Sequence, residues 1–290
     1  MSVVSPPTTE QVASFDGTEI AAHHWSGSDG VPLLVVNAIG PDHSAWRRVF
    51  GQPDRTRPVI GWDYRGLHSS GAPASDRLDA PAHSEDAVAV LEAAGVGDFV
   101  MAAWSTGTRV AVEIARTHPE RVRGICFVCG GFGSGLLGLL RHLEVAPLFP
   151  LGAAIGKHFA SALEGPFRAF VSRPEIAGVV RQSGVIGPTA DVDSIVEVLQ
   201  SFAACDLRRL LTIYERVVGS SDPRVLPEVQ APALLVGGGR DRFATNRMMD
   251  DMARRLPAAE KVVYEQASHF LPLEYPARLA ADMEGWFSDL

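Results

Sequence analysis

The sequence predicts an α/β protein with a mostly parallel, doubly wound sheet and a helical insert. Short apolar runs that suit strands buried on both faces alternate along the chain with segments of helical period. The sharpest example is "DFVMAAWSTGTRVAVEIA" (98–115), where an uncharged run passes almost at once into a helical pattern. The chain has 290 residues, 46% of them hydrophobic, which is enough to bury a large core. Strands that alternate with helices build parallel sheets covered on both faces.

The elements of this sheet can be placed in order along the chain. Residues 11–25 predict a hairpin around the Asp16-Gly17 turn. Residues 80–95 predict an amphipathic helix that ends at Gly95. The other expected strands, most of them running into loops, lie at 31–40, 57–66, 99–104, 122–131, 231–244 and 260–270, with helical patterns at 43–50, from 107 onward, and after each of the last two strands.

The alternation of strands and helices breaks after about residue 133. The segment that follows has a helical period, is interrupted by Pro147, Pro150 and Pro166, and is too long to be a loop. We therefore expect a helical cap packed over the carboxyl edge of the sheet. The predicted division is a core of residues 1–133 and 206–290 and a cap of residues 134–205.

Composition excludes several classes of function. A net charge of -8 and a pI near 5.6 argue against a nucleic-acid partner. Three cysteines indicate neither a disulfide framework nor a metal cluster, and Cys126 and Cys129 fall inside an apolar strand-like run. The amino terminus does not resemble a secretion signal, and we find no apolar run long enough to span a membrane. We expect a cytoplasmic protein, and the composition is compatible with a homodimer.

Three side chains with complementary chemistry follow predicted strands. Ser105, Asp241 and His269 each stand where a strand ends, and ligands of parallel α/β sheets bind beyond the carboxyl ends of the strands. A serine hydroxyl becomes a good nucleophile when a histidine takes its proton and a carboxylate orients that histidine. The three residue types therefore predict a nucleophile, an acid and a base.

The segments around these residues resemble those of one known family. "AWSTG" (103–107) is similar to the nucleophile elbow G-x-S-x-G, and "DYRGLHSSGAP" (63–73) to a D-x-R-G-x-G-x-S loop. "GGGRDRFA" resembles an acid loop and "SHFLPLEYP" a histidine loop. Together they resemble the α/β-hydrolase fold family over nearly the whole chain outside the insert. The resemblance implies a catalytic triad of Ser105, Asp241 and His269 that works without metal or organic cofactor.

The chain departs from that family pattern at three places. Ala103 replaces the first glycine of the elbow, and His68 replaces the second glycine of the D-x-R-G-x-G-x-S loop. "NAIG" (37–40) stands where relatives usually carry His-Gly. By position, the backbone N–H groups of Ile39 and Thr106 are the expected oxyanion-hole donors.

Each assignment has a structural alternative. Ser105 could serve only the turn, His269 could be a surface histidine, and Asp241 could cap the next helix or pair with a neighbouring arginine. Asp63 and Arg65 are interpreted as structural residues that tie down the loop below the site rather than as catalytic ones.

The expected substrate is small, apolar in part and ester-like. The insert carries more leucine and phenylalanine than one surface stripe needs, so some of these side chains are predicted to line a pocket above Ser105 and others to bury the insert on the core. The insert is not rich in Lys or Arg, which argues against docking on a lipid surface. Trp104 is expected in the core or in the pocket wall. The predicted substrate-binding residues are Trp104, Leu140, Leu143, Phe149 and Phe270.

The function predicted from the sequence is hydrolysis of a carboxylic ester, thioester or lactone through an acyl-enzyme. Three alternatives stay open: C–C bond hydrolysis, a biosynthetic cyclase or lyase using the same triad, and a ligand receptor without hydrolysis. An arginine-lined carboxylate pocket would favour C–C hydrolysis, and Arg168 and Arg181 are the candidates for it. Ser105 argues against epoxide hydrolases and haloalkane dehalogenases, which use a carboxylate nucleophile.

Overall fold

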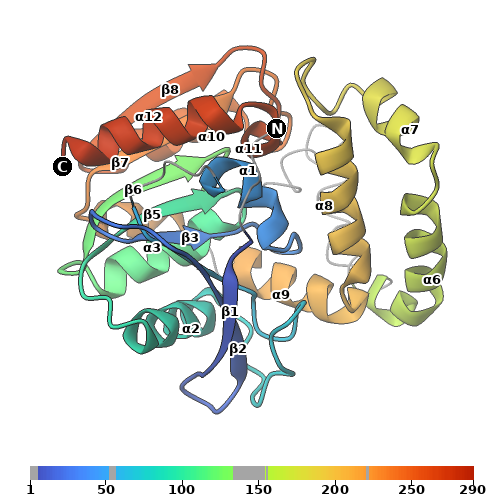
Figure 1. The fold of residues 1–290 in the computed structure, drawn as a ribbon, viewed down its shortest axis with the longest axis horizontal. Helices are drawn as coiled ribbons and strands as arrows, with labels where there is room; N and C mark the ends of the chain where they lie inside the picture. Colours follow the sequence, from blue (N-terminus) through green and yellow to red (C-terminus); the bar gives the residue numbers. More distant parts are fainter. Residues whose placement is uncertain (1–5, 52–56, 133–153, 155, 220–221) are drawn as a thin grey trace.

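The computed structural model describes residues 6–51, 57–132, 154, 156–219 and 222–290. In that part of the chain one eight-stranded sheet has the order β1-β2-β4-β3-β5-β6-β7-β8 (Figure 1). β2 pairs antiparallel with β1 and β4, and all other neighbours are parallel, so the predicted sheet is confirmed. The strands are β1 Thr8–Ala13, β2 Glu19–Trp25, β3 Leu33–Val36, β4 Val59–Trp62, β5 Phe99–Trp104, β6 Val122–Val128, β7 Ala233–Gly238 and β8 Ala259–Tyr264.

Helices cover both faces of the sheet (Figure 1). One apolar core lies between the sheet and α2, α3 and α10, and a second lies between the sheet and α1, α11 and α12. The described helices are η1 His43–Trp46, α1 Arg47–Phe50, α2 Ala80–Ala93, α3 Gly107–Thr117, α6 Ala160–Val171, α7 Ile176–Gln182, α8 Val192–Ala204, α9 Leu207–Gly219, η3 Pro223–Glu228, α10 Asn246–Ala253, α11 Leu271–Glu274 and α12 Pro276–Ser288.

The central strand β5 shows how the sequence produces two cores. All of its side chains are buried, as its uncharged run predicts. Successive side chains of a strand point to opposite faces, so Met101 packs into the first core and Ala102 into the second. At its carboxyl end the chain turns directly into α3, whose apolar face joins the first core.

The predicted turn at Gly17 and the predicted helix end at Gly95 are confirmed, and the structure adds a cap at the start of α2. Gly17 has a φ of +85° in the turn between β1 and β2. The carboxylate of Asp79 accepts a hydrogen bond from the Ala82 N–H at the start of α2. Gly95 has a φ of +67° just after that helix, a left-handed conformation that glycine adopts without steric cost.

Helices α6 to α9 are inserted between β6 and β7 (Figure 1). The expected interruption at Pro166 is wrong, because α6 runs through this residue from Ala160 to Val171. The carbonyl of Ala162, which loses its usual partner there, belongs to an exposed residue and can bond to water. The helical region continues beyond residue 205 into α9, and the division into core and cap stays a prediction.

The described helices contain none that is both long and apolar enough to cross a bilayer. The cysteines Cys126, Cys129 and Cys205 are buried free thiols. The expected cytoplasmic location and the homodimer stay predictions.

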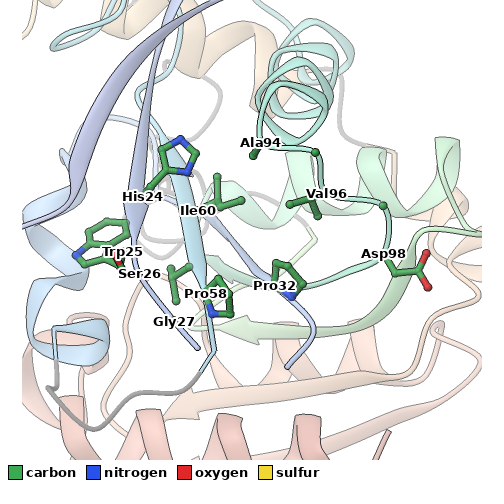
Figure 2. Close-up of a pocket in the computed structure, with 13 residues that line it drawn as sticks. His24, Trp25, Ser26, Gly27, Pro32, Pro58, Ile60, Ala94, Val96 and Asp98 are labelled. Carbon is green, nitrogen blue, oxygen red and sulfur yellow. The ribbon is translucent and has the colours of Figure 1, made fainter. Parts of the chain in front are cut away.

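A hollow of about 530 Å³ lies at the amino edge of the sheet (Figure 2). Its wall comes from the end of β2, the start of β4 and the turn before β5, with Trp25, Pro58 and Val96 among the lining residues. His24, which also lines it, is paired with Glu10 at 2.9 Å. This hollow is at the edge opposite to Ser105, which follows the carboxyl end of β5.

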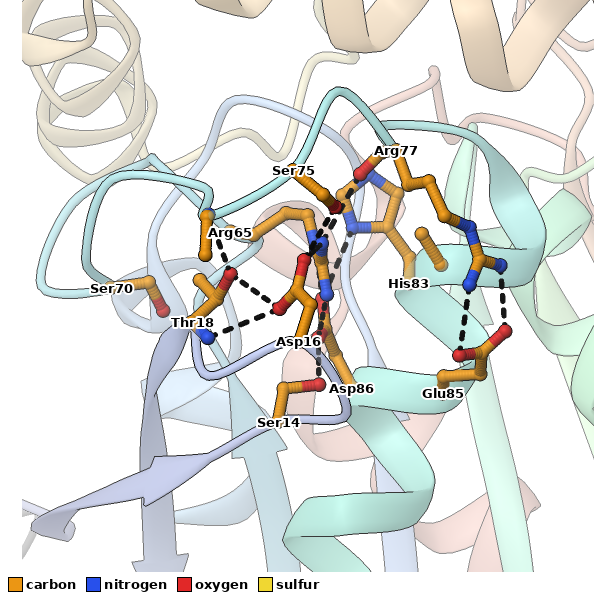
Figure 3. Close-up of polar contacts among 12 residues, drawn as sticks. Ser14, Asp16, Thr18, Arg65, Ser70, Ser75, Arg77, His83, Glu85 and Asp86 are labelled. Atoms are coloured by element: carbon orange, nitrogen blue, oxygen red, sulfur yellow. Dashed lines mark hydrogen bonds and ion pairs between the residues drawn. The ribbon is translucent and has the colours of Figure 1, made fainter.

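Arg65 joins three segments at the antiparallel side of the sheet (Figure 3). Its guanidinium is fully buried and binds both carboxylate oxygens of Asp86 on α2, at 2.8 and 2.6 Å. A further N–H donates to Asp16 in the hairpin turn at 2.8 Å. Burial alone would raise the pKa of Asp86, but hydrogen bonds from Arg65 and His83 outweigh it and lower that pKa. The structural role predicted for Arg65 agrees with these contacts.

Arg65→Met should lower the free energy of unfolding by about 3–5 kcal/mol, because it leaves the Asp86 carboxylate buried without its partner. Arg77→Met is the matched control, since Arg77 pairs with Glu85 on the exposed surface and should contribute about 0–1 kcal/mol. Urea unfolding measures both. Because the pKa of Asp86 is lowered in the folded state, its ionised carboxylate stabilises the fold at pH values above the ordinary pKa of 3.8. This contribution is lost as the pH falls below 3.8, so the free energy of unfolding of the wild type should decrease in that range. Equal losses in the two variants would contradict this role of Arg65.

Candidate active site

The turn from β5 to α3 places Ser105 in a strained backbone conformation. Its φ is +53°, which is uncommon for a residue with a side chain. The Ser105 N–H donates to the Val128 carbonyl at 3.0 Å, and the Ser105 carbonyl accepts from the Thr108 N–H at 3.1 Å. A Cβ at Gly107 would lie 2.3 Å from the Val36 carbonyl oxygen, so only glycine fits there.

Ser105, His269 and Asp241 form one hydrogen-bonded chain. His269 Nε2 lies 2.8 Å from Ser105 Oγ, and His269 Nδ1 lies 2.8 Å from Asp241 Oδ2. The Asp241 side chain is fully buried, whereas that of His269 is 13% exposed. The sequence placed these residues after three separate strands, and the fold brings them into contact.

Further hydrogen bonds hold Asp241 and His269 in place. Asp241 Oδ1 accepts from the N–H groups of Phe243 at 2.7 Å and Ala244 at 2.9 Å, which leaves Oδ2 directed at the histidine. Trp104 Nε1 donates to the carbonyl of His269 at 3.0 Å. The orientation of the imidazole is thus set through its ring nitrogen and through its backbone.

The buried carboxylate of Glu274 organises the loop that carries His269. Glu274 Oε2 accepts from the Ser268 N–H at 2.7 Å, and Oε1 accepts from the Ser268 hydroxyl at 2.5 Å. Oε1 also accepts from the Gly187 N–H at 2.7 Å. Glu274 therefore fastens the histidine loop to the segment between α7 and α8.

Asn37 organises the loop after β3. Its side-chain oxygen accepts from the Ala38 N–H at 2.8 Å and from Trp46 Nε1 at 3.0 Å. Its side-chain nitrogen donates to the carbonyls of Pro41 and Asp42, both at 2.9 Å. The asparagine thus closes the loop on itself and anchors it to η1.

The Ile39 N–H, one of the expected oxyanion-hole donors, has a partner within the protein. It donates to Thr106 Oγ1 at 2.8 Å, and both residues are buried. The hydroxyl of Thr106 therefore lies beside the N–H groups of Ile39 and Thr106, the two donors that the sequence predicts for the oxyanion hole. An oxyanion that uses the Ile39 N–H must take the place of this hydroxyl.

His68 supports the same loop from the segment after β4. His68 Nε2 lies 2.7 Å from the Gly40 carbonyl oxygen, so the ring N–H donates there. The φ of His68 is +49°, which explains why the family pattern has glycine at this position. A Cβ at Gly40 would lie 2.3 Å from the ring of Phe202 on α8. The Phe202 ring therefore packs directly on the loop that follows β3.

A cavity of about 310 Å³ opens above Ser105 and His269. Its described wall is mostly apolar, with Arg109, Tyr214 and His269 as polar exceptions among its larger side chains. The segments that build it are the loop after β3, the turn into α3, helices α8 and α9, and the acid and histidine loops. The larger described side chains in its wall are Ile39, Trp104, Arg109, Val198, Leu199, Phe202, Leu210, Leu211, Tyr214, Phe243, Met248, His269 and Phe270.

Comparison with known protein families identifies the fold. The family model for the alpha/beta hydrolase fold matches residues 31–276, which is most of the chain. This chain belongs to the α/β-hydrolase fold family. The eight-stranded, mostly parallel sheet with helices on both faces is consistent with that family.

Individual relatives are similar over nearly their whole length. The pimeloyl-[acyl-carrier protein] methyl ester esterase of Neisseria meningitidis is 28% identical over 253 residues, covering 86% of this chain and 90% of the relative. The 2-hydroxymuconate semialdehyde hydrolase of Pseudomonas putida is 24% identical over 276 residues, covering 90% and 88%. The crystal structure of the enol-lactonase from Burkholderia xenovorans shares the fold, with a TM-score of 0.75 at 19% identity, covering 96% and 100%.

The predicted substrate-binding residues are placed only in part. Trp104 and Phe270 line the cavity. Arg168 and Arg181, the candidates for a carboxylate pocket, are exposed and do not line it, and Arg168 Nε instead donates to the Ala203 carbonyl. The remaining predicted residues, Leu140, Leu143 and Phe149, lie outside the described residues.

Sequence reasoning missed several residues of the cavity wall. Arg109 is a charged residue in the helical pattern that follows Ser105, which alone would favour an exposed position, yet it is buried and lines the cavity. Phe243 and Met248 follow Asp241 and come from the acid loop and α10. In the sequence, the one signal for Phe243 and Met248 is that they closely follow Asp241.

Two clusters of described residues bring possible metal ligands within 4.8 Å of one another. One contains Cys129 beside Asp241 and His269, and burial raises the pKa of the Cys129 thiol well above its ordinary value, so it is a protonated and poor ligand. The other contains His23, His43 and Asp63, where His23 Nε2 is paired with Asp63 Oδ1 at 3.2 Å. The expected independence of metal and cofactor stays a prediction.

His68→Gly should lower kcat on p-nitrophenyl butanoate by about tenfold, a fraction of the 10²–10³ lost when an oxyanion donor is removed outright. The reason is that the Gly40 carbonyl loses its support next to Ile39. Stability should change little, because glycine relieves the left-handed backbone while the hydrogen bond is lost.

His68→Gln is the matched variant, since its amide N–H can replace the ring donor. It should retain most of the activity. Equal kcat values in wild type and His68→Gly would rule out this supporting role.

Proposed function

We propose that this α/β hydrolase is a serine hydrolase that cleaves a carboxylic ester, a thioester or a lactone with an apolar part. The observation that carries the proposal is the pair of 2.8 Å contacts from Asp241 to His269 and from His269 to Ser105, at the floor of a mostly apolar cavity. That arrangement supplies a nucleophile, a base and an orienting carboxylate in the order acyl transfer needs.

The proposed reaction runs through an acyl-enzyme. Ser105 Oγ attacks the carbonyl carbon while His269 Nε2 takes its proton. Asp241 accepts the Nδ1–H of the histidine, which fixes the tautomer and stabilises the imidazolium. His269 then gives its proton to the leaving alcohol, thiol or ring oxygen. Water repeats the sequence on the acyl-enzyme and releases the acid.

The proposed oxyanion hole consists of the backbone N–H groups of Ile39 and Thr106. Thr106 directly precedes α3, so its N–H lies at the positive end of the helix. The Thr106 hydroxyl accepts the Ile39 N–H at rest, and rotation of this side chain frees the donor for the developing oxyanion. The hydrogen bonds of Asn37 and His68 keep the backbone of this loop in place.

The names of the relatives support an ester or lactone as substrate, since they include a methyl ester esterase and an enol-lactonase. A second candidate is C–C bond hydrolysis in a carboxylate-bearing diketone. It is favoured by a guanidinium in the cavity wall and by the similarity to 2-hydroxymuconate semialdehyde hydrolase. Turnover of p-nitrophenyl esters of graded chain length separates the two, because an enzyme that is specific for C–C bonds would hydrolyse them poorly.

Ser105→Ala should abolish hydrolysis of p-nitrophenyl butanoate and labelling by a fluorophosphonate, with an unchanged melting temperature. The hydroxyl is the proposed nucleophile, and its removal changes no apolar contact. Mass spectrometry of the labelled wild type should find the adduct on Ser105. An adduct on another residue would overturn the assignment of the nucleophile.

Asp241→Asn should lower kcat by several orders of magnitude, as the corresponding change does by roughly 10⁴ in serine proteases. An amide in place of the carboxylate no longer accepts from Nδ1–H in the required tautomer. Asp250→Asn is the matched control, because Asp250 lies on α10 and pairs with Lys261. Normal turnover by Asp241→Asn would mean that another carboxylate orients His269.

A further inference from the structure

Two histidines and an aspartate come together where η1 begins. His23 lies on β2, His43 is the first residue of η1, and Asp63 directly follows β4. One ring nitrogen of each histidine and one carboxylate oxygen of Asp63 lie within 4.8 Å of one another. The two imidazole rings are close neighbours, with centroids 4.2 Å apart. Three segments that are distant in the chain thus bring together the nitrogen and oxygen donors that bind transition metals.

His23 and Asp63 are close to each other but poorly aligned for a hydrogen bond. His23 Nε2 lies 3.2 Å from Asp63 Oδ1, and no hydrogen bond joins the two atoms. On the other side of the ring, Nδ1 lies 3.0 Å from Thr9 Oγ1, a hydroxyl that can accept the Nδ1–H. Nε2 then carries a lone pair beside a carboxylate oxygen, and both side chains are almost fully buried. A cation bound by both atoms would replace this repulsion with two coordination bonds.

The surrounding contacts hold these donors as the neighbours of a metal site usually do. Asp63 Oδ2 accepts from the Ser69 N–H at 3.1 Å, which leaves Oδ1 on the side of His23. Ligating histidines and carboxylates are typically oriented by such hydrogen bonds on their other atoms. The Nδ1 of His43 is buried and has no hydrogen bond. A buried nitrogen of this kind costs free energy unless a ligand satisfies it.

The spacing of the donors suits a small divalent ion. Zn²⁺ binds nitrogen and oxygen at about 2.0–2.2 Å, so neighbouring ligand atoms of a tetrahedral site lie about 3.3 Å apart. The 3.2 Å between His23 Nε2 and Asp63 Oδ1 already matches that separation. His43 is only partly buried, so a rotation of its side chain can bring it to the ion, and solvent can supply water as a fourth ligand.

We propose that His23, His43 and Asp63 bind one divalent transition-metal ion of the zinc type. The ion is structural, because none of the three residues lines the described wall of the cavity above Ser105. It joins β2 and the segment after β4 to η1, at the end of the loop that follows β3. Ca²⁺ and Mg²⁺ fit less well, since both prefer oxygen ligands. This inference is independent of the proposed function.

The test uses Co²⁺ as a coloured probe and Zn²⁺ as its competitor. The full chain without an affinity tag, treated with EDTA and desalted, should bind one Co²⁺ and develop the visible absorption bands of a four-coordinate ion. Zn²⁺ should displace the Co²⁺, and at about a hundred times its dissociation constant it should raise the melting temperature by about 5 °C. His43→Phe should lose the bands and the Zn²⁺-induced shift, because phenylalanine keeps an aromatic ring beside His23 but offers no ligand atom.

His24→Phe is the matched control. His24 is the next residue on β2 after His23, it pairs with Glu10 near the surface, and it does not belong to the cluster. This variant makes the same replacement close by and should keep the Co²⁺ bands and the Zn²⁺-induced shift. Asp63→Asn is a second ligand variant, for use if circular dichroism shows that His43→Phe does not fold. It keeps the shape of the side chain and should weaken Co²⁺ binding by about tenfold or more.

The outcomes distinguish this site from binding elsewhere. Co²⁺ bands that are lost in a folded ligand variant and kept in His24→Phe support the proposal. Bands that persist in folded His43→Phe and Asp63→Asn mean that the ion binds elsewhere, for example at the cluster that contains Cys129, and they overturn it. Wild type without the bands of a four-coordinate ion overturns it as well. None of these measurements depends on hydrolysis, so the proposed function stands or falls separately.

Discussion

The close approach of α3 to the end of β3 is the constraint on which the site depends. A Cβ at Gly107 would lie 2.3 and 2.4 Å from the carbonyl oxygens of Val36 and Asn37. Because glycine permits this contact, the first turn of α3 lies against the loop that follows β3. The Ile39 N–H consequently meets the side chain of Thr106 at 2.8 Å. A bulkier residue would separate the nucleophile from the proposed oxyanion hole.

Among the described residues, three that are not glycine have a positive φ. Each of them lies in a loop at the edge of the sheet that carries Ser105. Ser105, His68 and Cys129 have φ values of +53°, +49° and +45°. Such conformations persist only where the surroundings hold them. Ser105 is held by the β6 backbone, His68 by the Gly40 carbonyl, and the thiol of Cys129 donates to the Ser268 carbonyl at 3.6 Å. Strain and hydrogen bonding therefore together define the backbone geometry at the edge of the sheet that carries the candidate site.

Polar side chains organise the loops at this edge where the chain departs from the family pattern that it resembles. Asn37 closes the loop after β3 through both atoms of its amide, and His68 adds a contact that a glycine could not make. Glu274 performs a similar task for the histidine loop. Departures from a family motif thus need not indicate loss of function, because the backbone geometry can be retained by other hydrogen bonds.

Much of the fold and the choice of the three proposed catalytic residues could be predicted from the sequence. Strand burial, helix period, the turn at Gly17 and the helix end at Gly95 depend on residues that are close in the chain, and such signals are local. Ser105, Asp241 and His269 could be singled out because each follows a strand and parallel strands end at one edge.

Only the tertiary structure decided how the cavity is walled and where its charge lies. Arg109 stands among the polar positions of an amphipathic helix, and its burial follows from the packing of α9 across α3. Arg168 and Arg181 have similar local surroundings in the sequence but are exposed. Pro166 likewise stays inside a helix because that helix lies at the surface. Chain-local patterns determine which elements form, whereas the burial of a side chain depends on segments distant in the sequence, so the substrate site of this protein is set by its tertiary packing.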